Sequence, residues 1–199
     1  GGANLTFSKA FSEDRAAPNG TVDLTFTISS AAESASTATG VTFTDDLAGF
    51  LTGTTATGLP ISACGGTLAG SAGDSLLTYS GGSVDPGDSC EFTVSLNLGN
   101  TIGDHRNSTS ILSSTAGGQT TTALAASADL TIATADPVTL SASFDPATAV
   151  PGATAQLSFT LTNPGSNPSD ATAISFTTSL ASALSGLTAT NGTYTDVCG

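Results

Sequence analysis

The sequence predicts an all-β protein built from immunoglobulin-like β-sandwich modules in tandem, one complete and one partial. Apolar and small polar residues alternate along many short segments, and turns rich in glycine and proline separate these segments. One such strand is written twice, as TVDLTFTI at residues 21–28 and as TAQLSFTL at residues 154–161. Met and Trp are absent while small residues dominate, so we expect twisted sheets and no long helix.

Seven short strands are predicted in the first module, a number typical of an immunoglobulin-like sandwich. They lie near residues 4–11, 20–30, 39–46, 74–80, 90–97, 106–114 and 119–132. Alternation within a strand predicts which side chains share a buried face. It places Lys9 with Leu5 and Phe7, Asp45 with Phe43, and Asn107 with Ile111. It also predicts that the last strand carries Leu124, Leu130 and Ile132.

The repeated strand belongs to a longer internal duplication. Many apolar and turn residues of the first half recur 133 positions later, among them Phe11 and Phe144, Pro18 and Pro151, Phe26 and Phe159, and Phe43 and Phe176. A constant shift over about forty residues indicates that strands and turns were copied together.

The duplication predicts the domain boundaries. Residues 1–133 form the complete module, residues 134–137 a short linker, and residues 138–199 the first half of a second, homologous module. Half a sandwich has unpaired strand edges, so we expect this part to be disordered, to be completed by another chain, or to belong to a longer protein.

Charge and hydropathy exclude several classes of function. The chain has three basic residues and sixteen acidic ones, for a net charge of −13, which would repel a nucleic acid backbone. No apolar run is long enough to span a bilayer, so we expect no membrane span in this segment. The sequence contains no recognisable catalytic motif, and we predict that the protein is not an enzyme.

Several motifs together resemble a known family. They are LSFTLTNP at residues 157–164, VTFTDDL at 41–47, CGGTL at 64–68 and CEFTV at 90–94. The chain is similar to the bacterial "conserved repeat domain" of unknown function, whose immunoglobulin-like modules occur in tandem in large secreted and cell-surface proteins. The resemblance implies an extracellular or bacterial cell-surface location and supplies no catalytic residues.

Cys64 and Cys90 are the predicted disulfide pair. Cys90 shares strand parity with Phe92 and Val94, and Cys64 begins a glycine-rich stretch before the next strand. The alternative is two buried free thiols. After Leu180 the two copies slip by one residue, so Cys198 corresponds to Cys64 with a difference of 134, and we expect the partner of Cys198 to lie beyond this fragment.

Lys9, the only lysine, is predicted to share a buried face with apolar residues. A lysine on the first strand, Asp45 on a middle strand and Asn107 on a late strand resemble the arrangement with which surface domains of Gram-positive bacteria form a Lys–Asn isopeptide bond. That reaction needs a desolvated lysine and a protonated carboxyl group. The alternative is that Lys9 extends to solvent or pairs with Asp45. In the second copy the first two positions hold Ala142 and Thr178.

Acidic residues in or near turns suggest calcium, which stiffens module junctions in many extracellular proteins. The candidate ligands are Asp45, Asp85, Asp88 and Asp136. No loop has the regular spacing of a dedicated calcium motif, so the alternative is a set of solvated acidic turns. No other cofactor is expected.

The sequence therefore predicts a structural, presentational segment of a bacterial surface protein, such as an adhesin, stalk or fibre, or a self-assembling filament subunit. Its partners would be neighbouring repeats, copies of the same chain, or a surface glycan or protein ligand. The alternative is a carbohydrate- or cation-binding accessory module of a secreted enzyme. Only Tyr79 and Tyr194 are obvious aromatic platforms for a sugar.

Overall fold

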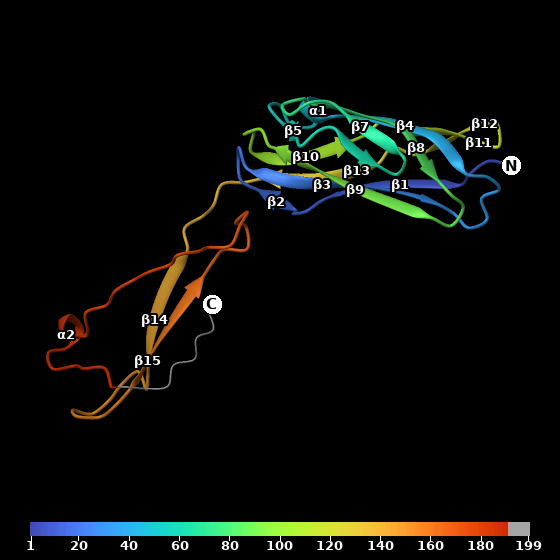
Figure 1. Cartoon of the computed structure of the whole chain (residues 1–199). Helices are drawn as coiled ribbons and strands as arrows, with labels where there is room; N and C mark the ends of the chain where they lie inside the picture. The colour runs from blue at the N-terminus through green and yellow to red at the C-terminus, as the bar shows by residue number, and fades with distance from the viewer. Residues whose placement is uncertain (191–199) are drawn as a thin grey trace.

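The computed structural model, which describes residues 1–190, confirms an all-β, immunoglobulin-like protein (Figure 1). The strands are β1 Leu5–Phe11, β2 Arg15–Ala16, β3 Thr21–Ser30, β4 Ala38–Asp46, β5 Thr55–Thr57, β6 Ile61–Ala63, β7 Gly66–Ala69, β8 Leu76–Val84, β9 Ser89–Asn97, β10 Gly103–Ser108, β11 Leu112–Ala116, β12 Gln119–Ala123, β13 Ser127–Ile132, β14 Thr139–Asp145 and β15 Gln156–Thr162. The short helices are α1 Leu47–Phe50 and α2 Leu180–Ala183.

Two main sheets form the sandwich in the first half of the chain. One has the strand order β1-β3-β9-β5, and the other has the order β12-β11-β4-β8-β7-β6. A smaller sheet, β10-β13-β2, completes the side of the sandwich, where β13 contacts β1 and β10 contacts β4. The first strand and the late strands of the module therefore lie next to each other across the join between sheets.

Strand β3 lies between β1 and β9 in the first sheet, and the strict alternation of its sequence buries one of its two faces. Leu24, Phe26 and Ile28 are fully buried, while the threonines between them face outward or are half-buried. Phe26 pairs with Lys9 on β1 and with Phe92 on β9. The residues that return in the second half are thus the centre of the core of the first.

Aromatic side chains from both main sheets fill the core. The ring centroids of Phe26 and Phe43 are 5.0 Å apart, those of Phe7 and Phe43 are 4.6 Å apart, and those of Tyr79 and Phe92 are 4.9 Å apart. Such pairs contribute about 0.5–1.5 kcal/mol each beyond the area that they bury. This cluster fixes the spacing between β1, β3 and β9 on one side and β4 and β8 on the other.

Two predicted strands are each divided. The segment predicted at 106–114 consists of β10 in the small sheet and β11 in the six-stranded sheet, and the segment at 119–132 consists of β12 and β13. Alternation does not continue across these breaks, so Ile111 and Leu124 are exposed, whereas Asn107 is buried. The prediction that Asn107 and Ile111 share a face is wrong, because the chain changes sheets between them.

Short elements between residues 47 and 69 are absent from the sequence prediction. Helix α1 begins after Asp46, whose carboxylate accepts a hydrogen bond from the Gly49 amide at 3.0 Å. Strands β5, β6 and β7 are too short to show an alternating pattern. Asp45 and Asp46 point to opposite faces, as alternation predicts.

The second half repeats the first part of the sandwich with the same shift of 133. Phe144 pairs with Leu157 as Phe11 pairs with Leu24, and α2 begins at Leu180 as α1 begins at Leu47. The rings of Phe159 and Phe176 are 5.0 Å apart, as are those of their counterparts Phe26 and Phe43.

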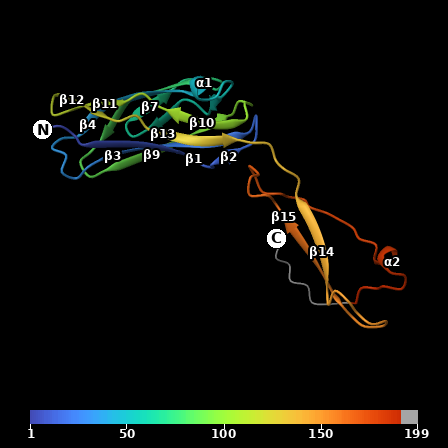
Figure 2. The ribbon, with the colours of Figure 1, turned by 180° about the vertical axis from the view of Figure 1, so that it is seen from behind.

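The second half differs from the first in burial. Five large apolar side chains of β14, β15 and the following segment are between 40% and 46% exposed, namely Leu140, Phe144, Phe159, Ile174 and Phe176. Both views show β14 and β15 standing away from the sandwich, joined to it through the chain that follows β13 (Figures 1 and 2). Cys198 lies outside the described residues.

Candidate functional site

Three polar side chains meet inside the first module, each from a different sheet. Lys9 comes from β1, Asp45 from β4 and Asn107 from β10. Lys9 Nζ lies 2.9 Å from Asp45 Oδ2, and it also donates to Asn107 Oδ1. Lys9 is 7% exposed, and the other two residues are fully buried. The structure thus brings together the three residues that the sequence singles out for a Lys–Asn bond.

Regular strand geometry explains why these side chains point inward. Lys9 alternates with Leu5 and Phe7, and its Nζ lies 5.9 Å from the centre of the Phe26 ring. Asp45 alternates with Phe43 on β4, and its backbone forms a bridge with Thr109, just beyond the end of β10. Lys9 is buried, as predicted, and it does not extend to solvent. The other part of that alternative, an ion pair between Lys9 and Asp45, is present in the structure.

Burial dominates the electrostatics of this cluster. Desolvation lowers the pKa of Lys9, while the charge of Asp45 and the hydrogen bond to it act in the opposite direction. Desolvation raises the pKa of Asp45, and the charge of Lys9 and its hydrogen bond oppose this rise. Both pKa shifts are in the direction of the neutral forms, an amine for Lys9 and a carboxylic acid for Asp45.

Two polar atoms of the cluster lack a hydrogen-bond partner within residues 1–190. They are Asp45 Oδ1 and Asn107 Nδ2, and both are inaccessible to solvent. Buried polar groups are nearly always hydrogen-bonded, and leaving one unsatisfied costs about 1–3 kcal/mol. An unsatisfied amide nitrogen next to a lysine amine is therefore a feature that needs a physical explanation.

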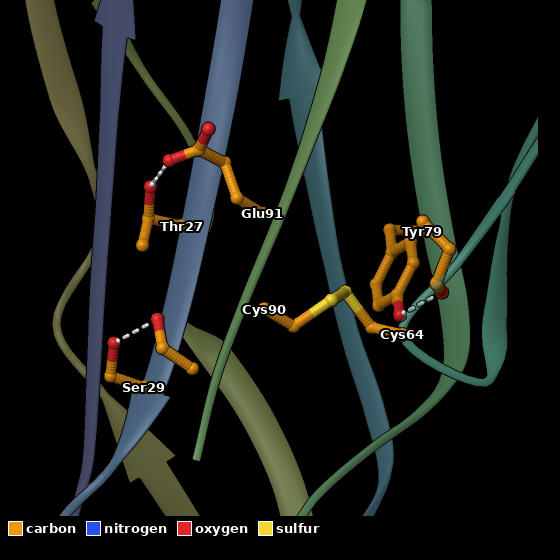
Figure 3. The surroundings of a disulfide bond; sticks show 8 residues. Thr27, Ser29, Cys64, Tyr79, Cys90 and Glu91 are labelled. Carbon is orange, nitrogen blue, oxygen red and sulfur yellow. Dashed lines mark hydrogen bonds between the residues drawn. A yellow bond between two sulfur atoms is a disulfide. The ribbon is translucent and has the colours of Figure 1, made fainter.

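A disulfide joins Cys64 and Cys90, the predicted pair, whose Cα atoms are 5.8 Å apart (Figure 3). Cys90 belongs to β9 of one main sheet, and Cys64 lies in the turn between β6 and β7 of the other. The disulfide therefore links the two sheets of the sandwich. The Tyr79 hydroxyl group donates to the carbonyl oxygen of Ala63 beside it, at 2.9 Å.

The four candidate calcium ligands are not brought together. Asp45 is buried with Lys9, whereas Asp85 and Asp88 are exposed in the turn between β8 and β9. Asp136 lies between β13 and β14, where it accepts a hydrogen bond from Ser166. Within residues 1–190, no group of three His, Cys, Asp or Glu side chains is arranged to hold a metal ion.

Tyr79 is fully buried in the aromatic core, so the prediction that it is a platform for a sugar is wrong. Phe43 points into the core, and Tyr79 is its paired residue across β4 and β8. Paired residues lie on the same face of a sheet, so Tyr79 points into the core as well. Tyr194 lies outside the described residues. Neither short helix of the described chain has the length and apolar character needed to cross a membrane.

Comparison with known proteins gives one family and several structures of similar fold. A family model described as "Domain of unknown function (DUF7933)" matches residues 6–132, more than half of the chain. No curated protein matches the sequence. The matching region covers the sandwich and includes Lys9, Asp45, Asn107 and both bonded cysteines.

Solved structures with a similar arrangement of strands have low sequence identity. A cohesin module of a Clostridium perfringens family 33 glycoside hydrolase is 9% identical with a TM-score of 0.40, and the match covers 65% of this chain and 98% of that one. The major pilin subunit of Bacillus cereus is 10% identical with a TM-score of 0.44, covering 71% and 43%. An Actinomyces fimbrial adhesin is 13% identical with a TM-score of 0.40, covering 70% and 58%. The match thus spans about half of the pilin and adhesin chains, and no activity is transferred from any of them.

Proposed function

We propose that this chain, which belongs to the DUF7933 family of domains of unknown function, is a structural segment that spaces or presents other parts of a bacterial extracellular surface protein. The observation that carries the proposal is the repetition of one strand arrangement at a constant shift of 133 along the chain. The β1–β3 pairing returns as β14–β15 in the same register. Modules strung in this way form extended arrays in which each unit contacts mainly its neighbours.

The disulfide supports an extracellular location. Disulfides persist in oxidising compartments and are rare in the cytosol. The bond between Cys64 and Cys90 ties the two sheets together, so it contributes to the stability of the module.

The outer face of the β1-β3-β9-β5 sheet also supports a structural role. Hydroxyl groups pair across its strands, with Thr25 and Thr93 2.8 Å apart and Ser29 and Ser89 2.8 Å apart (Figure 3 shows Ser29). Such pairs stabilise neighbouring strands. These hydroxyl groups are hydrogen-bonded to one another within the sheet, which suits a durable spacer.

Surface labelling of intact cells tests this function. An antibody raised against the full chain should label intact cells of the bacterium that produces the protein, with little increase after permeabilisation. The control is an antibody against a cytosolic protein, which should label only permeabilised cells. Labelling that requires permeabilisation would contradict an extracellular role.

A filament subunit is a second candidate within the same class. It is favoured by the exposed apolar side chains of β14 and β15, including Phe144 and Phe159, which a neighbouring copy could cover by adding strands. Negative-stain microscopy of the purified chain distinguishes the two. A subunit would form fibres with a regular axial repeat, whereas a spacer segment would remain as single particles.

A further inference from the structure

We propose that Lys9 and Asn107 become joined by an intramolecular isopeptide bond, and that the Asp45 carboxyl group assists the reaction. The three side chains are in contact, are buried, and come from strands that the fold holds in fixed positions. The product is a covalent link between β1 and β10, which belong to different sheets. This link is independent of the role proposed above, because it requires only that the module fold.

The reaction balances without a cofactor or an oxidant. Asp45 takes a proton from Lys9, which leaves a neutral amine and a carboxylic acid. The Nζ lone pair attacks Cγ of Asn107 while the carboxylic acid polarises the amide group. The bond from Cγ to Nδ2 then breaks. Asp45 gives its proton to the displaced nitrogen, which leaves as ammonia. Asp45 finally takes a proton from Nζ and is again a carboxylic acid. The net change is a primary amine and a primary amide giving a secondary amide and ammonia.

The arrangement of the cluster matches what each step requires. Lys9 Nζ contacts the amide oxygen that is bonded to Cγ, so the nucleophile is next to the carbon that it attacks. A buried, fixed geometry of this kind removes much of the entropic cost of bringing two groups together. Water is excluded, so hydrolysis of the amide does not compete.

The two unsatisfied atoms are the ones that the reaction uses. Asn107 Nδ2 is the leaving group, and within residues 1–190 it makes no hydrogen bond of normal geometry. The Asn107 side chain nevertheless lies near enough to the Asp45 carboxyl group to act on the pKa of that group. Asp45 Oδ1 is free to exchange a proton with the amide group, while Oδ2 accepts from Lys9. The directions of both pKa shifts are those that the reaction requires. Burial disfavours the charged forms, which lowers the pKa of Lys9 and raises the pKa of Asp45.

The reaction also explains why a lysine is present in this core. An ion pair away from water costs desolvation energy that its mutual attraction often fails to recover. The reaction converts the amine to a neutral amide, which has a much smaller desolvation cost. In the second copy of the motif the corresponding positions are Ala142 and Thr178, so the lysine and the acid are absent together.

Intact-mass spectrometry of the full, reduced and denatured chain tests the proposal. We expect a mass lower than the sequence value by one ammonia molecule. The variants Lys9→Met and Asn107→Ala should have the masses of their own sequences. An unmodified chain at its full sequence mass would overturn the proposal, as would an ammonia loss that persists in Lys9→Met, since that loss would come from another asparagine.

Tryptic digestion locates the bond. Lys9, Arg15 and Arg106 are the only lysine and arginine residues, so an unlinked chain releases residues 1–9 and 10–15 as separate peptides. In the linked chain we expect residues 1–15 to remain attached to a piece that contains Asn107, even after reduction of the disulfide. Release of free 1–9 from the whole sample would contradict the bond.

The role of Asp45 is tested with Asp45→Asn, which preserves the shape of the side chain but cannot exchange a proton. We expect the unlinked mass in this variant, while its far-ultraviolet circular dichroism shows the same sheet content as the parent chain. A folded Asp45→Asn chain that still loses ammonia at the parent rate would exclude the assisting role.

Discussion

At the level of single residues, alternation along a strand predicts which side chains point into the core. Lys9 and Asp45 show how far this prediction reaches, and Asn107 shows where it ends. An odd-numbered lysine among odd-numbered apolar residues must point inward if the strand is regular, and Lys9 does. Parity does not reveal distance, however. Only the folded strands bring β1, β4 and β10 close enough for contact, and the segment that holds Asn107 was predicted with the wrong neighbours.

In a variant without the lysine, the ionisation of Asp45 should make the unfolding free energy depend strongly on pH. In Lys9→Met the carboxyl group remains buried beside Asn107 and Asp46, and burial keeps its pKa above the ordinary value of 3.8. A carboxyl group whose pKa is raised by folding stabilises the folded state below its unfolded pKa, and that contribution is lost as the pH rises through the folded pKa.

We therefore expect Lys9→Met and the double variant Lys9→Met/Asp45→Asn to have similar unfolding free energies near pH 3.5. As the pH rises to 7, the double variant should become more stable by on the order of 2–3 kcal/mol. Urea denaturation at several pH values measures this difference. A difference that does not change with pH would show that Asp45 is not held in a desolvated site.

At the level of elements, the repeated strand provides a matched pair of substitutions. Phe26 is fully buried in β3, whereas its counterpart Phe159 in β15 is 40% exposed. We expect Phe26→Ala to reduce the unfolding free energy of the sandwich by about 3–5 kcal/mol. Phe159→Ala should change it by less than about 1 kcal/mol. Guanidinium denaturation followed by circular dichroism compares the two, and equal effects would contradict the difference in burial.

The disulfide is a second link between elements. Cys64 and Cys90 are 26 positions apart, and closing a loop of that size stabilises a fold by about 3 kcal/mol in the chain-entropy account. We expect Cys64→Ser/Cys90→Ser to lose about this much, and Cys198→Ser, which leaves the pair intact, to lose none. Denaturation of the parent chain with and without a reductant should show the same difference.

The sequence predicted the long strands and missed the short ones for a physical reason. Strand β3 spans ten residues and alternates throughout, so its burial could be read directly. Strands β5 and β6 have three residues each, which is too few to show a period. The change of sheet between β10 and β11 depends on contacts with β4 and β13 that are remote in sequence. Elements whose bounds depend on partners remote in sequence therefore cannot be located from the sequence pattern and are seen only in the structure.

At the level of the whole molecule, the proposed bond between Lys9 and Asn107 would enclose the disulfide. The disulfide at positions 64 and 90 lies within the segment enclosed by Lys9 and Asn107, which are 98 positions apart. In a string of modules, tension enters and leaves through the ends of each unit. With the isopeptide bond in place, tension passes directly from β1 to β10, and the enclosed core with its disulfide carries no load.

Single-molecule stretching of the chain between its ends should reveal this nesting. Full extension of the reduced Lys9→Met variant should exceed that of the parent by about 340 Å, the contour length of 98 residues. Reducing the disulfide should lengthen Lys9→Met by about 90 Å and leave the parent unchanged, because its 26-residue loop is already shielded. An equal response of both chains to the reductant would show that no bond closes the outer loop.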